Sequence, residues 1–194
     1  WSSDVCSSDL LYVSEIGLII LLLIVIILFI MWTIGNFKNK APFITSSNAV
    51  LKDVEKALEV KNNSVVYDLG CGDGRILFYL SQNNPKAKYI GIENGTFPFL
   101  LSKVGSFLNK KKTNNSVQVM RKDFFKQDLS DATHIFTYLY PNVMDDLLLK
   151  FDKELKPGTR LVSLSFKFTN KPPLFEVDLG RSKYKLGRKL FVYQ

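Results

Sequence analysis

A glycine-rich segment that directly follows an apolar run constrains the fold of this chain more than any other feature. It reads VVYDLGCGDGRI from Val65 to Ile76 and places glycines at Gly70, Gly72 and Gly74. Glycine adopts backbone conformations closed to other residues and has no side chain, so such a turn can approach a ligand closely. An apolar strand, a glycine turn and the start of an amphipathic helix are typical of an α/β sheet with a ligand at its edge.

The spacing of these glycines excludes two common nucleotide-binding motifs. A dinucleotide fingerprint requires G-x-G-x-x-G, and its last position holds Arg75 here. A phosphate-binding P-loop requires G-K-[ST], which the segment lacks. Asp68 stands before the first glycine, and a carboxylate there suits a ligand with a positive amino acid group and no phosphate.

The rest of the chain alternates strand-like and helix-like stretches. Helices are expected at 48–59, from Arg75 onward, and at 97–108 and 143–155. Strands are expected at 64–69, 88–93, 117–120, 133–139, 160–166, 174–179 and 190–193. This alternation predicts an α/β fold: a Rossmann-like, doubly wound sheet of seven strands, with helices on both faces and a C-terminal antiparallel hairpin.

Acidic and aromatic residues follow the predicted strands. Glu93 ends the second strand, where a carboxylate can accept hydrogen bonds from both hydroxyls of a ribose. Asp123 and Phe124 follow the third strand, where a short acid can bind an adenine amino group and a ring can pack on the base. With Asp68 and the glycine turn, these residues predict one ligand site; the alternative is an ordinary α/β domain with scattered surface acids.

An uncharged run of 19 residues, Ile16 to Ile34, precedes the glycine motif. As a helix it measures about 28 Å, close to the roughly 30 Å hydrocarbon core of a bilayer. Acidic residues precede the run and Lys38 follows it, so the positive-inside rule predicts a single-pass membrane protein with a cytoplasmic C-terminal domain. We expect a transmembrane anchor over 11–37, a linker over 38–47 and the catalytic domain over 48–194.

The first ten residues, WSSDVCSSDL, read as the translation of a common sequencing adapter. We therefore expect residues 1–10 to be an artefact and exclude them from fold reasoning. The two cysteines of the chain provide neither a disulfide framework nor a metal site.

Positive charge is concentrated in the C-terminal part of the chain. All 26 basic residues and all but three of the 18 acidic residues follow Phe37, so that part carries +11 against +8 for the whole chain. Such a charge favours an anionic partner, with a membrane surface as the nearest candidate and nucleic acid as a less favoured one; the alternative is a lysine-rich solvated surface without a partner. Lysines 110–112 are expected to form a solvated helix end, with a contact to a membrane or an acidic partner as the alternative.

On these motifs the sequence resembles the class I, seven-strand S-adenosylmethionine-dependent methyltransferases, from residue 48 to the end. Within that class it is similar to the membrane-anchored lysine methyltransferases that modify the ATP synthase c subunit and the adenine nucleotide carrier of mitochondria. The narrower resemblance rests on the apolar helix before the domain and on PFITS at 42–46, RKD at 121–123 and LYP at 139–141.

The resemblance implies S-adenosylmethionine as cofactor, no metal, and a lysine of a membrane-associated protein as methyl acceptor. It implies cofactor contacts for Thr45, Asp68, Gly70, Cys71, Gly72, Gly74, Glu93, Asn94, Asp123 and Phe124. Tyr138 and Tyr140 are implied near the transferred methyl group as catalytic residues, although both could instead complete the core at a strand end. Two other functions stay open: methylation of a small lipophilic molecule such as a quinone or lipid, and a tethered cofactor-binding module without catalysis.

Overall fold

The computed structural model describes residues 4–38, 46, 48–113, 115–180 and 188–194. The chain divides into two compact units, Trp1–Lys38 and Asn39–Gln194. They are described in turn.

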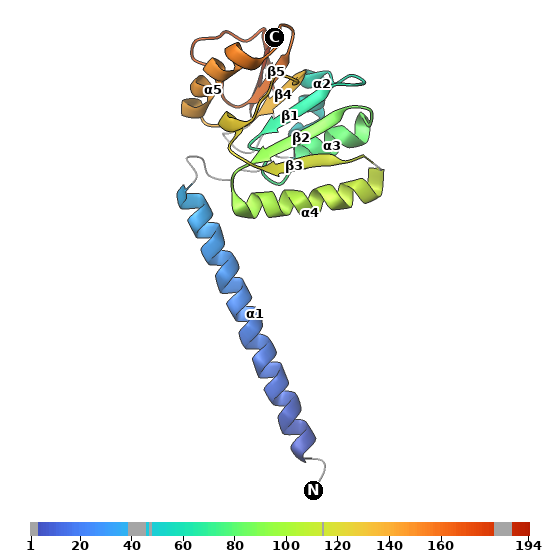
Figure 1. The fold of residues 1–194 in the computed structure, drawn as a ribbon, viewed down its shortest axis with the longest axis vertical. Helices are drawn as coiled ribbons and strands as arrows, with labels where there is room; N and C mark the ends of the chain where they lie inside the picture. Colours follow the sequence, from blue (N-terminus) through green and yellow to red (C-terminus); the bar gives the residue numbers. More distant parts are fainter. Residues whose placement is uncertain (1–3, 39–45, 47, 114, 181–187) are drawn as a thin grey trace. The chain divides into compact units, whose positions relative to one another are not determined.

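The first unit is a single helix, α1 (Asp4–Lys38), of 35 residues (Figure 1). Side chains are described for residues 14–30 and Thr33, and every large apolar side chain from Ile16 to Ile30 is exposed. Within the described residues, no helix is both long enough and apolar enough to span a membrane. The helix predicted here is therefore confirmed, but its transmembrane character is not.

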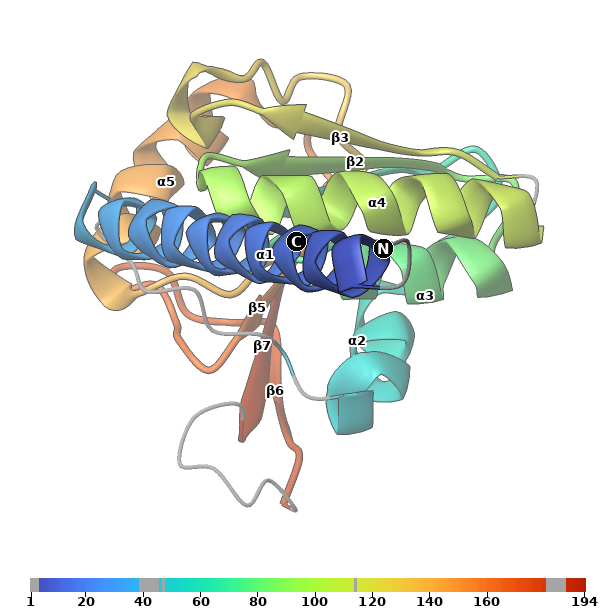
Figure 2. The ribbon, with the colours of Figure 1, turned by 90° about the horizontal axis from the view of Figure 1, so that it is seen from below.

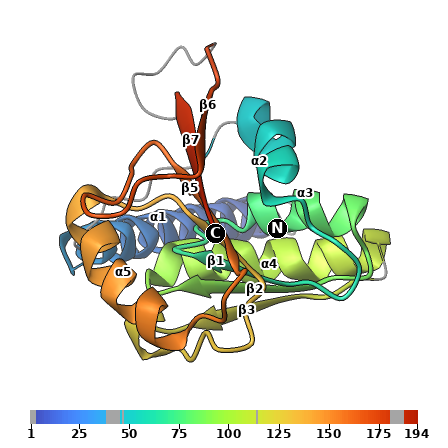
Figure 3. The ribbon, with the colours of Figure 1, turned by 90° about the horizontal axis from the view of Figure 1, so that it is seen from above.

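The second unit is built on a seven-stranded sheet with the order β3-β2-β1-β4-β5-β7-β6. Its strands are β1 (Val65–Leu69), β2 (Lys88–Glu93), β3 (Val117–Arg121), β4 (His134–Thr137), β5 (Arg160–Leu164), β6 (Phe175–Asp178) and β7 (Lys189–Tyr193). The first five are parallel, and β7 runs antiparallel to both β5 and β6. Figure 3 shows β6 and β7 at the edge of the sheet farthest from β3. The doubly wound sheet and its C-terminal hairpin are thus confirmed.

Helices cover both faces of the sheet (Figure 2). They are α2 (Leu51–Leu58), α3 (Arg75–Asn83), α4 (Thr96–Thr113) and α5 (Pro141–Glu154), with short 3-10 turns η1 (Asn48–Val50) and η2 (Phe124–Lys126). One hydrophobic core joins α2 and α3 to the sheet, and the other joins α5 to the opposite face. Side chains alternate along β1, so Val66 enters the first core and Tyr67 the second. Asp68 comes next, where β1 runs into the glycine turn.

Most predicted boundaries differ from the observed ones by one residue or more, and three of the differences have a clear physical reason. The strand predicted at 133–139 ends at Thr137, because α5 begins at Pro141 and residues 138–140 lead into it. The strand predicted at 160–166 ends at Leu164, because Ser165 has φ of 71° and leaves the extended conformation. The helix predicted at 97–108 runs on to Thr113, since lysine is a good helix former.

Candidate active site

The carboxyl ends of β1 and β2 hold the glycine turn and Glu93 together. The backbone N–H groups of Gly70 and Cys71 donate to the Ile92 carbonyl, at 2.9 and 3.1 Å. The Glu93 carboxylate accepts from the N–H of Gly72 at 2.9 Å through Oε2. It also accepts from the N–H of Gly95 at 2.7 Å through Oε1. The structure therefore fixes the turn against the end of the neighbouring strand.

Glycine is needed in this turn for two physical reasons. Gly70, Gly72 and Gly74 have φ of 79°, 58° and 81°, a region that other residues rarely adopt. In addition, a Cβ at Gly70 would lie 3.0 Å from Leu139, and one at Gly74 would lie 2.7 Å from the Phe78 ring. Close packing of protein side chains, which the sequence did not reveal, therefore also requires glycine at these positions.

The Cys71 side chain faces the core rather than the turn. It is buried, and a Cβ at Gly91 in β2 would lie 2.7 Å from its sulfur. Burial raises the pKa of the Cys71 thiol well above its usual range. The cofactor contact predicted for Cys71 would therefore be made by its backbone and not by its side chain.

Three carboxylates concentrate negative charge at the turn. Asp68 is 2% exposed, and the carboxylates of Glu93 and Asp73 act on it with like charge. Burial, then the charges of Glu93 and Asp73, raise the pKa of Asp68 well above its usual range. Burial also raises the pKa of Glu93, against the lowering effect of its backbone N–H partners. A buried carboxylate beside further negative charge is costly, so the site fits a ligand that brings a positive charge.

Arg75 ties the segment before the domain to the glycine turn. Its guanidinium pairs with Asp73 at 2.5 Å and donates to the Ser46 carbonyl at 2.8 Å. Ser46 is thereby held beside the start of α3. Thr45, the preceding residue and a predicted cofactor contact, lies outside the described residues.

The predicted adenine contacts lie at the end of β3, next to Glu93. The N–H of Lys122 donates to the Glu93 carbonyl at 3.2 Å, which joins the ends of β3 and β2. Asp123 caps η2 by accepting from the Phe125 N–H at 3.0 Å, and both Asp123 and Phe124 are partly exposed. The cofactor contacts predicted for these residues, and for the exposed Asn94, remain predictions.

Three aromatic rings meet at the ends of β4 and β5. The Phe166 ring stacks on Tyr138, with centroids 6.4 Å apart, and on Tyr140, with centroids 5.6 Å apart. The hydroxyl of Ser163 donates to the Phe166 carbonyl at 2.6 Å, and so fixes the residue that joins the two tyrosines. Burial raises the pKa of Tyr138, while a hydrogen bond with the Ser165 side chain lowers it.

Phe166 was missed as a site residue because the sequence pattern placed it inside a strand. Its local signal is that it lies two residues after Leu164, at which β5 ends. The partnership with Tyr138 and Tyr140 is a contact between two strand ends, which no local pattern reveals.

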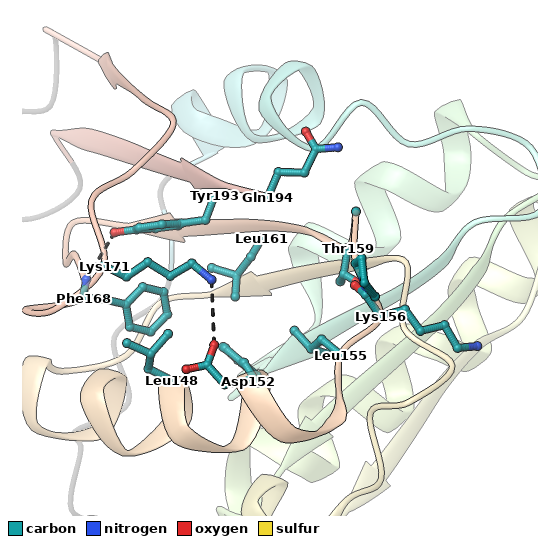
Figure 4. Close-up of a pocket in the computed structure, with 13 residues that line it drawn as sticks. Leu148, Asp152, Leu155, Lys156, Thr159, Leu161, Phe168, Lys171, Tyr193 and Gln194 are labelled. Atoms are coloured by element: carbon teal, nitrogen blue, oxygen red, sulfur yellow. Dashed lines mark hydrogen bonds and ion pairs between the residues drawn. The ribbon is translucent and has the colours of Figure 1, made fainter.

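A cavity of about 340 Å³ lies elsewhere, beside α5 and the amino end of β5 (Figure 4). Leu161, Phe168 and Tyr193 line it, and an ion pair of 3.9 Å joins Lys171 to Asp152 at its side. No residue of the glycine turn or of the aromatic stack lines this cavity. Among the described residues, no group of His, Cys, Asp and Glu is suited to hold a metal ion.

Comparison with known proteins identifies the family. A sequence family described as "ANTKMT methyltransferase domain" matches residues 68–174, from Asp68 through the glycine turn to the end of the aromatic stack and beyond. The chain belongs to this methyltransferase family.

Relatives of the methyltransferase include a protein-lysine N-methyltransferase of Saccharolobus islandicus (strain REY15A). It is 31% identical over 151 residues, which cover 77% of this chain and 92% of the relative. The adenine nucleotide translocase lysine N-methyltransferase of Mus musculus is 28% identical over 144 residues, or 74% of this chain and 61% of the relative.

A solved structure supports the same assignment. The RNA methyltransferase from Salinibacter ruber, in complex with S-adenosyl-L-homocysteine, superposes with a TM-score of 0.70 at 27% identity, over 77% of this chain and 92% of that one. The chain is therefore an S-adenosylmethionine-dependent methyltransferase. The cofactor contacts predicted for Asp68 and Glu93 remain predictions.

Proposed function

We propose that this methyltransferase transfers methyl groups to a lysine side chain of a membrane-associated protein. The aromatic stack of Tyr138, Phe166 and Tyr140 carries the proposal. Two relatives named as lysine methyltransferases add support. S-adenosylmethionine supplies, when bound, a methyl group on a positively charged sulfur.

The stack can prepare a lysine amine for this reaction. The amine must be neutral to attack, yet its free pKa is about 10.4. An aromatic, partly buried site disfavours the charged ammonium and lowers that pKa. Because methyl transfer requires in-line alignment, the main contribution of the stack is to position the acceptor nitrogen. The Tyr140 hydroxyl is a candidate hydrogen-bond partner for that nitrogen.

The proposal also assigns α1 as a single-pass membrane anchor with the domain on the cytoplasmic side. Support comes from the exposed aliphatic side chains of residues 16–30 and from the basic residues that follow the helix. The test is a reporter fusion at the C-terminus of the chain expressed in cells. Activity only of a reporter that works in the cytoplasm supports this topology, and activity only of an exported reporter contradicts it.

The substrate class is tested with radiolabelled S-adenosylmethionine, the full chain and membranes from its own cells. We expect label on protein, and acid hydrolysis of that protein should yield methyl-lysine. Label that ribonuclease releases would instead favour RNA, the substrate named for the Salinibacter ruber structure. Label that partitions into organic solvent would favour a lipophilic small molecule.

A further control separates catalysis from binding alone. A chain that binds S-adenosylhomocysteine but transfers no label to protein, RNA or lipid would be a tethered cofactor-binding module. That outcome would overturn the proposed reaction and leave the cofactor site intact.

A further inference from the structure

The inward face of α4 carries Pro98 and Phe99 near its start and small or polar residues farther along. Ser102 and Asn109 are buried there, and Asn109 donates to the Ser81 hydroxyl in α3 at 2.9 Å. The Ser106 hydroxyl donates to the Val117 carbonyl in β3 at 2.5 Å. Gly105 admits the Phe78 ring, which would lie 2.4 Å from a Cβ at that position. Hydrogen bonds and one inserted ring therefore hold α4 to the sheet and to α3, beside which it lies (Figure 2).

The outward face of the same helix is apolar. Val104, Phe107 and Leu108 are 60%, 60% and 58% exposed. Leu100 and Leu101 extend the stripe toward the start of α4, at 48% and 41%. These positions recur at the helical spacing of three and four residues and so lie on one side. This stripe is not the side on which α4 packs against the sheet, because the opposite side of the helix makes the contacts with the core.

Lysines flank the apolar stripe. Lys103 and Lys111 extend over the rings of Phe99 and Phe107, at 5.6 and 4.6 Å from their centroids. Lys110 and Lys112 add charge in the last turns, and α4 contains no acidic residue. A helix with an apolar face bordered by lysines, whose long side chains lie along that face, is typical of elements that rest in a membrane interface.

We infer that the outward face of α4 docks on an anionic lipid bilayer surface. The flanking lysines match anionic headgroups, and the aliphatic stripe matches the boundary with the acyl chains. α4 begins at Thr96, three residues after Glu93, so docking brings the active-site edge close to the lipid surface. The proposed anchor α1 would also bind a bilayer, but the inference drawn here rests on α4.

The test places a fluorophore on the stripe in the full chain. Phe107→Cys is labelled with bimane in a chain that carries Cys6→Ser, since Cys71 is buried. The protein is mixed with vesicles of phosphatidylcholine alone or of equal parts phosphatidylcholine and phosphatidylglycerol, each with brominated acyl chains. We expect loss of most bimane emission on the anionic vesicles, and recovery of emission when Lys103→Glu and Lys111→Glu are added.

Matched controls lie on α5. Leu149 is 65% exposed, so a bimane at Leu149→Cys should stay unquenched on both vesicles, and Lys153→Glu should change nothing. Vesicle flotation with an unquenched Phe107→Cys label overturns the inference and leaves the anchor standing. If flotation and quenching both occur on anionic vesicles and neither occurs on phosphatidylcholine alone, the result supports α4 docking and contradicts the proposed anchor. The inference is also overturned if quenching of the Phe107→Cys label is the same on both kinds of vesicle and in the lysine variants. A shift of the label's emission without lipid, caused by a second copy of the chain, overturns it as well.

Discussion

At the residue scale, the Asp68 carboxylate combines burial with like charge on its neighbours. Asp68 is the second-last residue of β1, and Glu93 and Asp73 add further negative charge near it. Such a buried negative charge lowers the stability of the free protein and raises its affinity for a cationic ligand, because only the bound ligand offsets the charge. Stability and binding should therefore respond to its removal in opposite directions.

Asp68→Asn should stabilise the cofactor-free protein at neutral pH and remove most of its affinity for S-adenosylhomocysteine. The pKa of Asp68 is higher in the folded protein than in the unfolded chain. The contribution of Asp68 to stability is therefore full at a pH below its unfolded-state pKa, and it is lost as the pH rises through its folded-state pKa. The melting temperature of the variant should thus exceed that of the wild type by a margin that grows from acid pH to neutrality. Binding should weaken by about 2–5 kcal/mol by calorimetry. A variant that is less stable at neutral pH and binds normally would contradict both parts.

Tyr140→Phe tests whether the Tyr140 hydroxyl orients the acceptor. The phenyl ring can keep its stacking on Phe166, so folding and cofactor affinity should be unchanged. The rate of methyl transfer should fall about tenfold, which corresponds to roughly 1.4 kcal/mol of lost transition-state stabilisation. An unchanged rate would leave Tyr140 a packing role only.

At the scale of the elements, Phe78 in α3 fits between two glycines. A Cβ at Gly74 would lie 2.7 Å from its ring, and one at Gly105 in α4 would lie 2.4 Å from it. One aromatic ring thus sets how closely α3 approaches both the glycine turn and α4. The packing of the two helices and the conformation of the cofactor turn are coupled through this ring.

A double-mutant cycle measures that coupling. Gly105→Ala alone should destabilise the protein, because overpacking costs about 1–3 kcal/mol and exceeds the roughly 1 kcal/mol gain in helix propensity. In a Phe78→Leu background, which lacks the clashing ring atoms, the same change should be neutral or stabilising. Denaturant unfolding of the four proteins gives the interaction energy. Additive effects would show that the ring moves aside at little cost.

At the scale of the whole molecule, both cores lie within residues 39–194, and so does the entire described site. The positive charge of the chain also lies almost wholly there, apart from Lys38. The proposed anchor lies in the other unit, so catalysis should be separable from that attachment.

Deletion of residues 1–38 should leave folding and S-adenosylhomocysteine affinity unchanged, within about 0.5 kcal/mol. Methylation of the native target in membranes should fall, because confinement to one bilayer raises effective concentration by about 10²–10⁴. Dissolving the membranes in detergent should abolish the difference between the two chains. A difference that persists in detergent would mean that the first unit supports catalysis itself.

The order of strands and helices could be predicted from the sequence, because apolar periodicity is local and the turn residues mark the ends of elements. Lys88–Glu93 was predicted with its observed bounds, and Asp68, Glu93 and Asp123 were placed at strand ends where the parallel sheet brings them to one edge. The glycine turn was recognisable because positive φ values demand glycine.

Other features depended on contacts between residues far apart in the chain, which only the tertiary structure decides. The sulfur of Cys71 packs against Gly91 of the next strand, and Phe166 joins Tyr138 to Tyr140 across two strand ends. The outward direction of the α4 stripe was equally hidden, because an amphipathic pattern does not tell which face meets the sheet. In α4 the face that does so carries Pro98 and Phe99 beside polar residues, whose hydrogen bonds reach α3 and β3.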